Sequence, residues 1–213
     1  MKNKNSRVNK IADYLRKEIM YGNLKAGDQI KEHHLSKVFE VSRVPVREAL
    51  RILHSEGYLD MIPNRGSFVR KISKDYFKEV TEMYLILAPV LLKDSIPRFK
   101  DSDFKKAYSV LKKIDNCTDF NKVGYLIWDF GKAIFGPSKL KFTMSVINEI
   151  YKHNIRALND VFVKSSNFKY DTSAHKKFLE LCKKKETSEA IKVWIEHSQR
   201  LSKNIAQKTI ADD

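Results

Sequence analysis

Three arginines, Arg43, Arg47 and Arg51, recur at intervals of four within the stretch VSRVPVREALRILHSEG. Residues four apart lie on one face of an α-helix, so this spacing predicts a basic ridge. A guanidinium group carries five N–H donors in a planar fork, which fits phosphate oxygens and the O6 and N7 atoms of guanine. The ridge could therefore bind a polyanion or read base pairs. An ordinary solvated charged face would show the same spacing.

The apolar residues of the same stretch predict how the ridge is positioned. They follow the i, i+3, i+4, i+7 spacing of a core-facing stripe: Val46, Ala49, Leu50 and Leu53. The helix is expected to begin around Pro45, because proline is tolerated in a first helical turn, and to end at Gly57. It would then be anchored by one face and present the arginines on the other.

Two further helices and a hairpin are predicted around this helix. Apolar spacing indicates a helix over residues 8–21 and a short one over residues 32–39, with Leu35 and Val38 in its core face. After the arginine helix, YLDMI and SFVRKI flank the turn PNRG and predict a hairpin. Two helices joined by a short turn, followed by a hairpin, describe a winged helix-turn-helix. Its third helix enters the major groove of DNA.

Composition limits the class of protein. The chain has 213 residues, of which 42% are hydrophobic, and this predicts globular domains rather than disorder. No apolar run is long enough to span a bilayer, and no secretory signal follows the basic N-terminus, so no membrane association is expected. The two cysteines, Cys117 and Cys182, lie far apart and outside any CxxC motif. A cytoplasmic protein is therefore expected.

The net charge of +15 favours a polyanionic partner. Residues 1–74 hold 16 Lys and Arg against 8 Asp and Glu, so their net positive charge per residue is about double that of residues 75–213. This supports a nucleic-acid partner for the first third of the chain.

From Asp75 onward the pattern predicts helices only, approximately at residues 75–95, 101–115, 119–135, 138–164, 171–184 and 187–208. The run MYLILAPVLL, Met83 to Leu92, is apolar nearly all round, which is typical of a helix buried in the middle of a bundle. Pro89 within it is expected to kink the helix or to start a new turn. We therefore expect a mostly α protein with a winged helix-turn-helix at residues 1–74 and an all-α bundle at residues 75–213.

The stretch from Leu24 to Val69 resembles the DNA-binding domain of the GntR family of bacterial transcription regulators. The resemblance rests on the SR-V-P-V-R-E-A-L core, the L…EG helix end and the G…V wing. Ala26 stands where the family usually has proline. Val44 replaces a common threonine that could cap the helix and contact phosphate.

The resemblance implies which residues contact double-stranded DNA. Arg43 and Arg47 would read bases, and Ser42 would lie beside a phosphate. The wing tip, Arg65 and Gly66, would enter the minor groove. Two weaker candidates complete the set: His33, where some members carry an arginine, and Arg51, which lies one turn deeper and would contact phosphate or nothing.

The helical half resembles the fatty-acid-regulator-like (FCD-type) branch, whose C-terminal domain binds small-molecule effectors and dimerises. Many members hold a divalent metal there with one Asp or Asn and three histidines. His175 and His197 match two of these histidines, but Ile127 and Gly131 stand where the first helix would supply the carboxylate and the other histidine. Asp129 is offset by two residues, which turns it away. The two histidines could hold a metal or an effector, or be polar pocket residues.

The expected function is a dimeric, effector-controlled transcription regulator, a repressor, that binds a pseudo-palindromic operator. The alternative is a basic protein that binds nucleic acid without sequence preference or effector response. No enzyme is expected, because the chain has no Gly-rich phosphate loop, no H-E-x-x-H motif and no nucleophile elbow.

Overall fold

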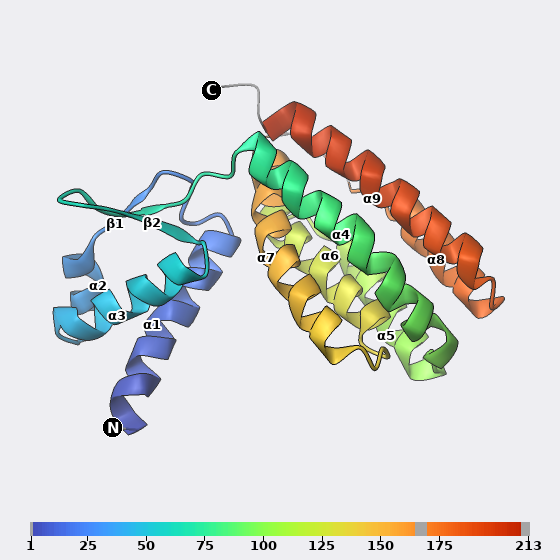
Figure 1. Cartoon of the computed structure of the whole chain (residues 1–213), viewed down its shortest axis with the longest axis horizontal. Helices are drawn as coiled ribbons and strands as arrows, with labels where there is room; N and C mark the ends of the chain where they lie inside the picture. The colour runs from blue at the N-terminus through green and yellow to red at the C-terminus, as the bar shows by residue number, and fades with distance from the viewer. Residues whose placement is uncertain (1, 165–169, 210–213) are drawn as a thin grey trace. The chain divides into compact units, whose positions relative to one another are not determined.

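The structure is a computed structural model that describes residues 2–164 and 170–209, with side chains described at residues 6–119, 122–155 and 170–207. The chain divides into two compact units, Met1–Ile72 and Ser73–Asp213. In Figure 1 the first unit is blue to teal and the second runs from green to red. The expected boundary, after residue 74, lies two residues further along.

The first unit packs its helices around one small core. The helices are α1 (Lys2–Met20), α2 (Glu32–Val38) and α3 (Arg43–Ser55). Both α1 and α2 contact α3, so α3 is held on two sides. The largest fully buried side chains of this unit come from all parts of it: Ile11, Leu15, Leu50, Leu53, Tyr58 and Leu59. The expected winged helix-turn-helix with an all-α second half is confirmed.

A small antiparallel sheet forms the wing. Its strands are β1 (Gln29–Ile30), β2 (Leu59–Ile62) and β3 (Gly66–Val69), in the order β1-β3-β2. Ile62 pairs with Gly66, which leaves a three-residue loop, Pro63 to Arg65. The hairpin was predicted, whereas β1 was not, because its two residues are too few to show an alternating pattern.

The expectation that Val38 is a core residue was wrong, because its side chain is 53% exposed. Leu35 is buried as expected, but α2 ends at Val38 and the chain turns away there. Phe39 instead packs edge-on against Tyr14 of α1, with ring centroids 5.3 Å apart. A seven-residue helix offers a single inward turn, so a residue at its end need not share that environment.

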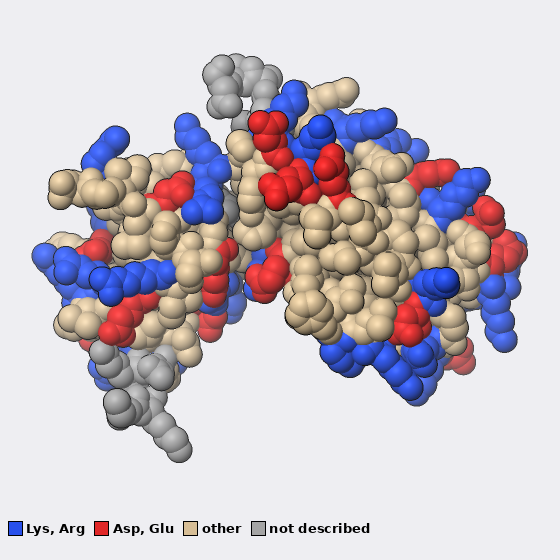
Figure 2. All heavy atoms as spheres, in the orientation of Figure 1, with Lys and Arg blue, Asp and Glu red and all other residues tan. Residues whose placement is uncertain are grey.

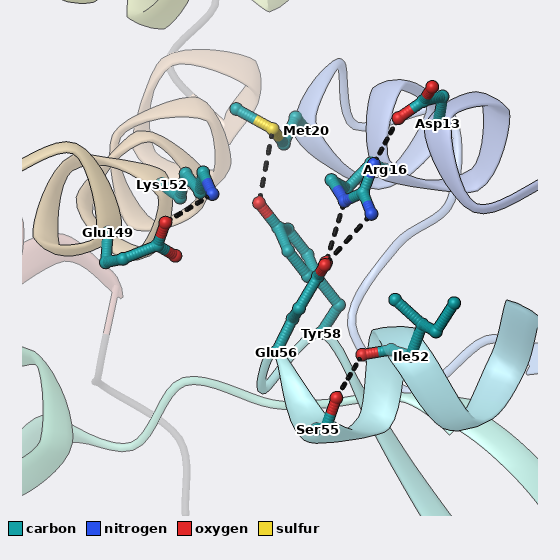
Figure 3. Close-up of polar contacts among 9 residues, drawn as sticks. All are labelled: Asp13, Arg16, Met20, Ile52, Ser55, Glu56, Tyr58, Glu149 and Lys152. Carbon is teal, nitrogen blue, oxygen red and sulfur yellow. Dashed lines mark hydrogen bonds and ion pairs between the residues drawn. The ribbon is translucent and has the colours of Figure 1, made fainter. Parts of the chain in front are cut away.

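A partly buried ion pair links α1 to the end of α3 (Figure 3). The Nε and Nη2 atoms of Arg16 donate to the two carboxylate oxygens of Glu56 at 2.7 and 2.9 Å, and Asp13 accepts a further hydrogen bond. The Glu56 carboxylate raises the pKa of Arg16. Beside this pair, Tyr58 donates to the Met20 sulfur at 3.5 Å, so the two elements are joined by polar contacts as well as by the core.

Removal of this pair should destabilise the first unit. We expect Glu56→Gln to lower the free energy of unfolding by about 1–2 kcal/mol, because a charge-assisted bidentate contact is lost. Urea unfolding monitored by circular dichroism would measure it. Glu149→Gln, which breaks the exposed 2.7 Å pair with Lys152 also drawn in Figure 3, is the control and should cost less than about 0.5 kcal/mol. Equal losses of unfolding free energy in the two variants would show that the Arg16–Glu56 contact stabilises the fold no more than an exposed ion pair does.

The second unit is a helical bundle. Its described helices are α4 (Lys74–Ser95), the 3-10 turn η1 (Ile96–Arg98), α5 (Asp101–Asp115), α6 (Phe120–Phe135), α7 (Lys141–Lys164), α8 (Ser173–Lys183) and α9 (Thr187–Thr209). Ser73 caps α4 by accepting a hydrogen bond from the Tyr76 backbone at 3.2 Å. At the other end of α4, Asp94 accepts hydrogen bonds from Ser138 and Lys139, which fixes the start of α7. These predicted helices are present to within a few residues at each end.

The expectation that α4 is buried all round was wrong. Its inner face packs on α6, α7 and α9 and buries Tyr84, Ala88, Leu91 and Leu92. Its outer face leaves Met83, Ile86 and Val90 exposed. The helix runs without a break through Pro89. Within the described residues, no helix combines the length and apolar character that crossing a bilayer requires.

Candidate functional site

The arginine ridge lies on the exposed face of α3. Arg43, Arg47 and Arg51 are all exposed. The opposite face is entirely buried: Val46, Ala49, Leu50 and Leu53 are each 0% exposed. Figure 2 shows basic side chains over this helix. Since the core fixes the helix, the guanidinium groups are held at defined positions while remaining accessible.

Arg47 is oriented by a carboxylate of the preceding helix. Its Nε donates to both oxygens of Glu32 at 2.9 and 3.2 Å. The terminal nitrogens of Arg47 donate to no described residue, so the edge used for bidentate recognition stays available. Sequence reasoning missed Glu32, because the two residues are 15 positions apart and only the helix-turn-helix geometry brings them together.

The start of α3 favours an anion. Ser42 is the N-cap residue, and its hydroxyl forms no capping hydrogen bond. The first turn holds no acidic side chain. The unpaired N–H groups and the positive end of the helix dipole therefore face solvent beside an exposed hydroxyl, which suits a phosphate group. His33 is exposed on α2.

The wing tip is held in shape by a side chain outside the hairpin. Gln29 of β1 donates through Nε2 to the Arg65 carbonyl at 2.9 Å. Gly66 adopts φ of 100°, a conformation that a side chain would strain. The Arg65 guanidinium lies 6.0 Å from the Phe68 ring centroid. Arg65 and Gly66 are both exposed, so a cationic tip is presented by a constrained loop.

Two histidines meet in the bundle around one tyrosine hydroxyl. The rings of His175 in α8 and His197 in α9 have centroids 4.7 Å apart. The Tyr170 hydroxyl lies 3.4 Å from Nε2 of His175 and 3.1 Å from Nε2 of His197. The hydroxyl can donate to only one of these nitrogens, so the other imidazole must donate its own Nε2–H to the hydroxyl oxygen. The Tyr170 hydroxyl thus pairs with both Nε2 atoms, whereas Nδ1 of each histidine is buried without a hydrogen-bond partner in the described structure. Sequence reasoning did not single out Tyr170.

The surroundings of both histidines favour the neutral imidazole near neutral pH. Burial, together with the neighbouring His197, holds the pKa of His175 well below its usual value. Burial, assisted by the positive charge of Arg200 and opposed by Asp171, lowers the pKa of His197 to about 4. Near neutral pH the pair therefore offers hydrogen bonds and lone pairs but no charge.

A cavity of about 60 Å³ adjoins the histidines. None of its described lining side chains is Asp, Glu, Lys or Arg. Aromatic rings form much of the wall, and Trp194 donates to the Tyr84 hydroxyl at 2.8 Å. Asn154 also lines it, and its amide oxygen is buried without a hydrogen-bond partner in the described structure. The lining suits an uncharged ligand that can donate a hydrogen bond.

The residues on α6 do not fit a divalent metal. Ile127 lines the cavity with an alkyl side chain. A Cβ atom at Gly131 would lie 3.2 Å from the Trp128 ring and 3.4 Å from Tyr151, whose rings stack at 4.2 Å, so a histidine at this position would require these rings to shift. Asp129 is half-buried and pairs with Lys132. The described residues contain no group of three His, Cys, Asp or Glu able to hold a metal ion.

Comparison with known proteins agrees with the geometry of the first unit. Residues 7–69 match the family model described as bacterial regulatory proteins, gntR family. The chain is 38% identical over 76 residues to the uncharacterized HTH-type transcriptional regulator YdhC of Bacillus subtilis (strain 168), which covers 36% of this chain and 33% of that protein. It is 42% identical over 59 residues to the HTH-type transcriptional repressor RspR of Escherichia coli (strain K12), 28% of this chain and 26% of that protein. These matches span about a third or less of the relatives' length.

A solved structure extends the likeness of the fold to both units. The putative transcriptional regulator GntR from Rhodococcus sp. RHA1 matches with a TM-score of 0.81. The match covers 94% of this chain and 97% of that one, at 19% sequence identity. At this identity the likeness concerns the fold alone.

Proposed function

Because the chain belongs, through residues 7–69, to the GntR family of bacterial regulatory proteins, we propose that it is a transcription regulator that binds DNA sequence-specifically. The observation that carries the proposal is the exposed arginine ridge of α3 opposite a fully buried face. A side chain held by a packed helix can discriminate between bases, whereas a mobile basic tail contacts only phosphates.

In this proposal α3 lies in the major groove. Arg43 and Arg47 donate to the O6 and N7 atoms of guanine, and Glu32 holds Arg47 through Nε. Ser42 and the start of α3 contact a phosphate.

The other contacts position the domain. The wing tip, Arg65 and Gly66, enters the adjacent minor groove. Arg51 and His33, which flank the base-reading arginines, contact the sugar-phosphate backbone. Such contacts fix the register of the protein on DNA but carry no sequence information directly.

Two copies would read a pseudo-palindromic operator with half-sites about one helical turn apart, since the symmetry of a dimer is mirrored in its site. One relative is named a repressor, and we propose repression here as well. The bundle would belong to the FCD-type branch and hold the two copies together. We propose no enzymatic activity for the chain.

The experiment that tests this function is selection of genomic DNA fragments by the purified chain at about 150 mM salt, followed by sequencing. A shared short palindrome is expected. Fragments without a common motif, bound with a steep dependence on salt, would favour the alternative of non-specific binding through the +15 charge.

We further propose that a small-molecule effector binds beside His175 and His197. The supporting observations are the uncharged aromatic lining and the buried Asn154 oxygen that lacks a partner. An uncharged ligand that donates hydrogen bonds would avoid the cost of removing a charge from water. It would alter operator binding only if it binds two states of the dimer with different affinity, one that fits the operator and one that does not.

The effector site should work without a metal. With Tyr170 between the two histidines, the purified chain is expected to contain far less than one metal ion per chain by elemental analysis. Excess EDTA, Zn²⁺ or Mn²⁺ should leave the melting temperature within about 1 °C, since only a ligand of the native state shifts it. A stoichiometric ion, or a melting temperature that falls with EDTA, would contradict the assignment.

A further inference from the structure

One face of α4 exposes a line of apolar side chains. Met83, Ile86 and Val90 are 44%, 63% and 47% exposed, and their spacing of three and four places them on one side of the helix. The opposite side is buried in the bundle. Scattered exposed apolar residues need no explanation, but a stripe along a helix that is apolar on both sides indicates burial against another surface.

Charged residues of opposite sign bracket this stripe. Asp75, Glu79 and Glu82 are exposed toward the start of α4, and Lys93 is exposed toward its end. In Figure 2 carboxylates and basic side chains are mixed around the start of α4, and largely uncharged surface follows along its middle. Glu79 precedes Ile86 by seven residues and Lys93 follows it by seven, so each lies about 10 Å from it along the axis. Neither Glu79 nor Lys93 forms an ion pair with a described residue.

We propose that this stripe docks on the same stripe of a second copy of the chain, with the two α4 helices antiparallel and the two-fold axis at Ile86. Met83 of one copy then lies near Val90 of the other. Glu79 faces Lys93, and symmetry repeats this pair at the other end. The result is an apolar centre with a charged rim, as in other protein interfaces. The inference rests on the proposed dimeric regulator and names the surface that joins its copies.

The charge pattern decides the direction of pairing and the kind of partner. A parallel arrangement would place Glu79 against Glu79 and Lys93 against Lys93, and like charges would repel. The antiparallel arrangement pairs opposite charges without any other protein. The stripe is therefore complementary to itself, which favours a second copy over an unrelated partner.

Cysteine cross-linking tests the position of the axis. In full-length Cys117→Ser protein, Ile86→Cys places two thiols at the axis, within reach of a disulfide. Mild oxidation should convert most of the chain into a covalent dimer. Phe142→Cys is the control, since Phe142 is 81% exposed but lies on α7. Absence of cross-linking at residue 86, or equal cross-linking at residue 142, would overturn the proposal.

A charge exchange tests the register. Lys93→Glu and Glu79→Lys should each raise the dimer Kd about tenfold or more. Each change places two side chains of like charge opposite each other, and symmetry repeats this repulsion at the other end of the interface. The double exchange should restore the original Kd to within about threefold, an outcome that two independent losses of structure would not give. Ile86→Glu should raise the Kd about 100-fold with an unchanged circular dichroism spectrum. Sedimentation equilibrium measures all four, and single exchanges without effect would refute the register.

Failure of this inference can be told apart from failure of the proposed function. A wild-type dimer that survives Ile86→Glu would overturn the α4 interface and leave the dimeric regulator intact. A wild-type monomer at micromolar concentration would overturn both the interface and the dimer, while the selected palindrome would still test DNA binding. A wild-type dimer that Ile86→Glu dissociates and Ile86→Cys cross-links would support the interface.

Discussion

Replacing both Arg43 and Arg47 by alanine should abolish preference for the selected operator. Each bidentate contact to guanine contributes about 1–3 kcal/mol of discrimination, so the double variant should lose about 100-fold or more in operator affinity. The residual binding should approach that of unrelated DNA, because the remaining basic side chains still contact phosphates. Both arginines are exposed on a helix fixed by its buried face, so the variant should remain folded. Fluorescence anisotropy with operator and scrambled duplexes measures the difference.

Arg51→Ala is the matched control, because it removes a guanidinium from the same exposed face of α3. It should weaken binding to both duplexes by the same factor and reduce the salt slope by about one unit. Sequence preference that survives in the Arg43→Ala/Arg47→Ala protein would show that α3 does not read the operator. A loss of preference in Arg51→Ala would move the base-reading surface one turn deeper.

The first unit and the helix boundaries were largely predictable, because their signals are local. Pro45 near the start of α3 and Gly57 beyond its end mark this helix, and the same residues carry the family resemblance. The contacts that complete the site are not local. Glu32 meets Arg47, and Gln29 meets Arg65, only after the chain has folded. No spacing rule connects residues that lie 15 or 36 positions apart.

The burial of side chains was harder to predict than the positions of the helices. Apolar periodicity says which side chains avoid water, but not what covers them. The run from Met83 to Leu92 is apolar all round, yet its own bundle covers only one side. The same limit of sequence-based prediction applies to the pocket in the bundle. The sequence pattern brought His175 and His197 into consideration, whereas the Tyr170 hydroxyl between them depends on the path of the segment that precedes α8.

Folding stability should fall as the pH is lowered below about 6.5. In the unfolded chain a histidine has a pKa near 6.5, whereas in the folded protein the pKa of His197 is about 4 and that of His175 is also lowered. Between these values the unfolded state binds more protons, so acidification favours unfolding. His197 alone should remove about 2 kcal/mol of stability between pH 7 and pH 5, and His175 adds to this loss in the same direction. Urea unfolding at half-unit intervals of pH measures it.

The groups around the histidines determine whether this dependence belongs to them. Asp171 and Asp115 oppose the lowering of the His175 pKa and Arg200 assists that of His197, but burial dominates both. His197→Gln should therefore flatten the stability profile between pH 7 and pH 5 by about 2 kcal/mol, whatever it costs at pH 7. An unaltered slope in His197→Gln would mean that this histidine can be protonated in the folded protein. The pocket would then offer a positive charge, and an anionic effector would replace the uncharged one.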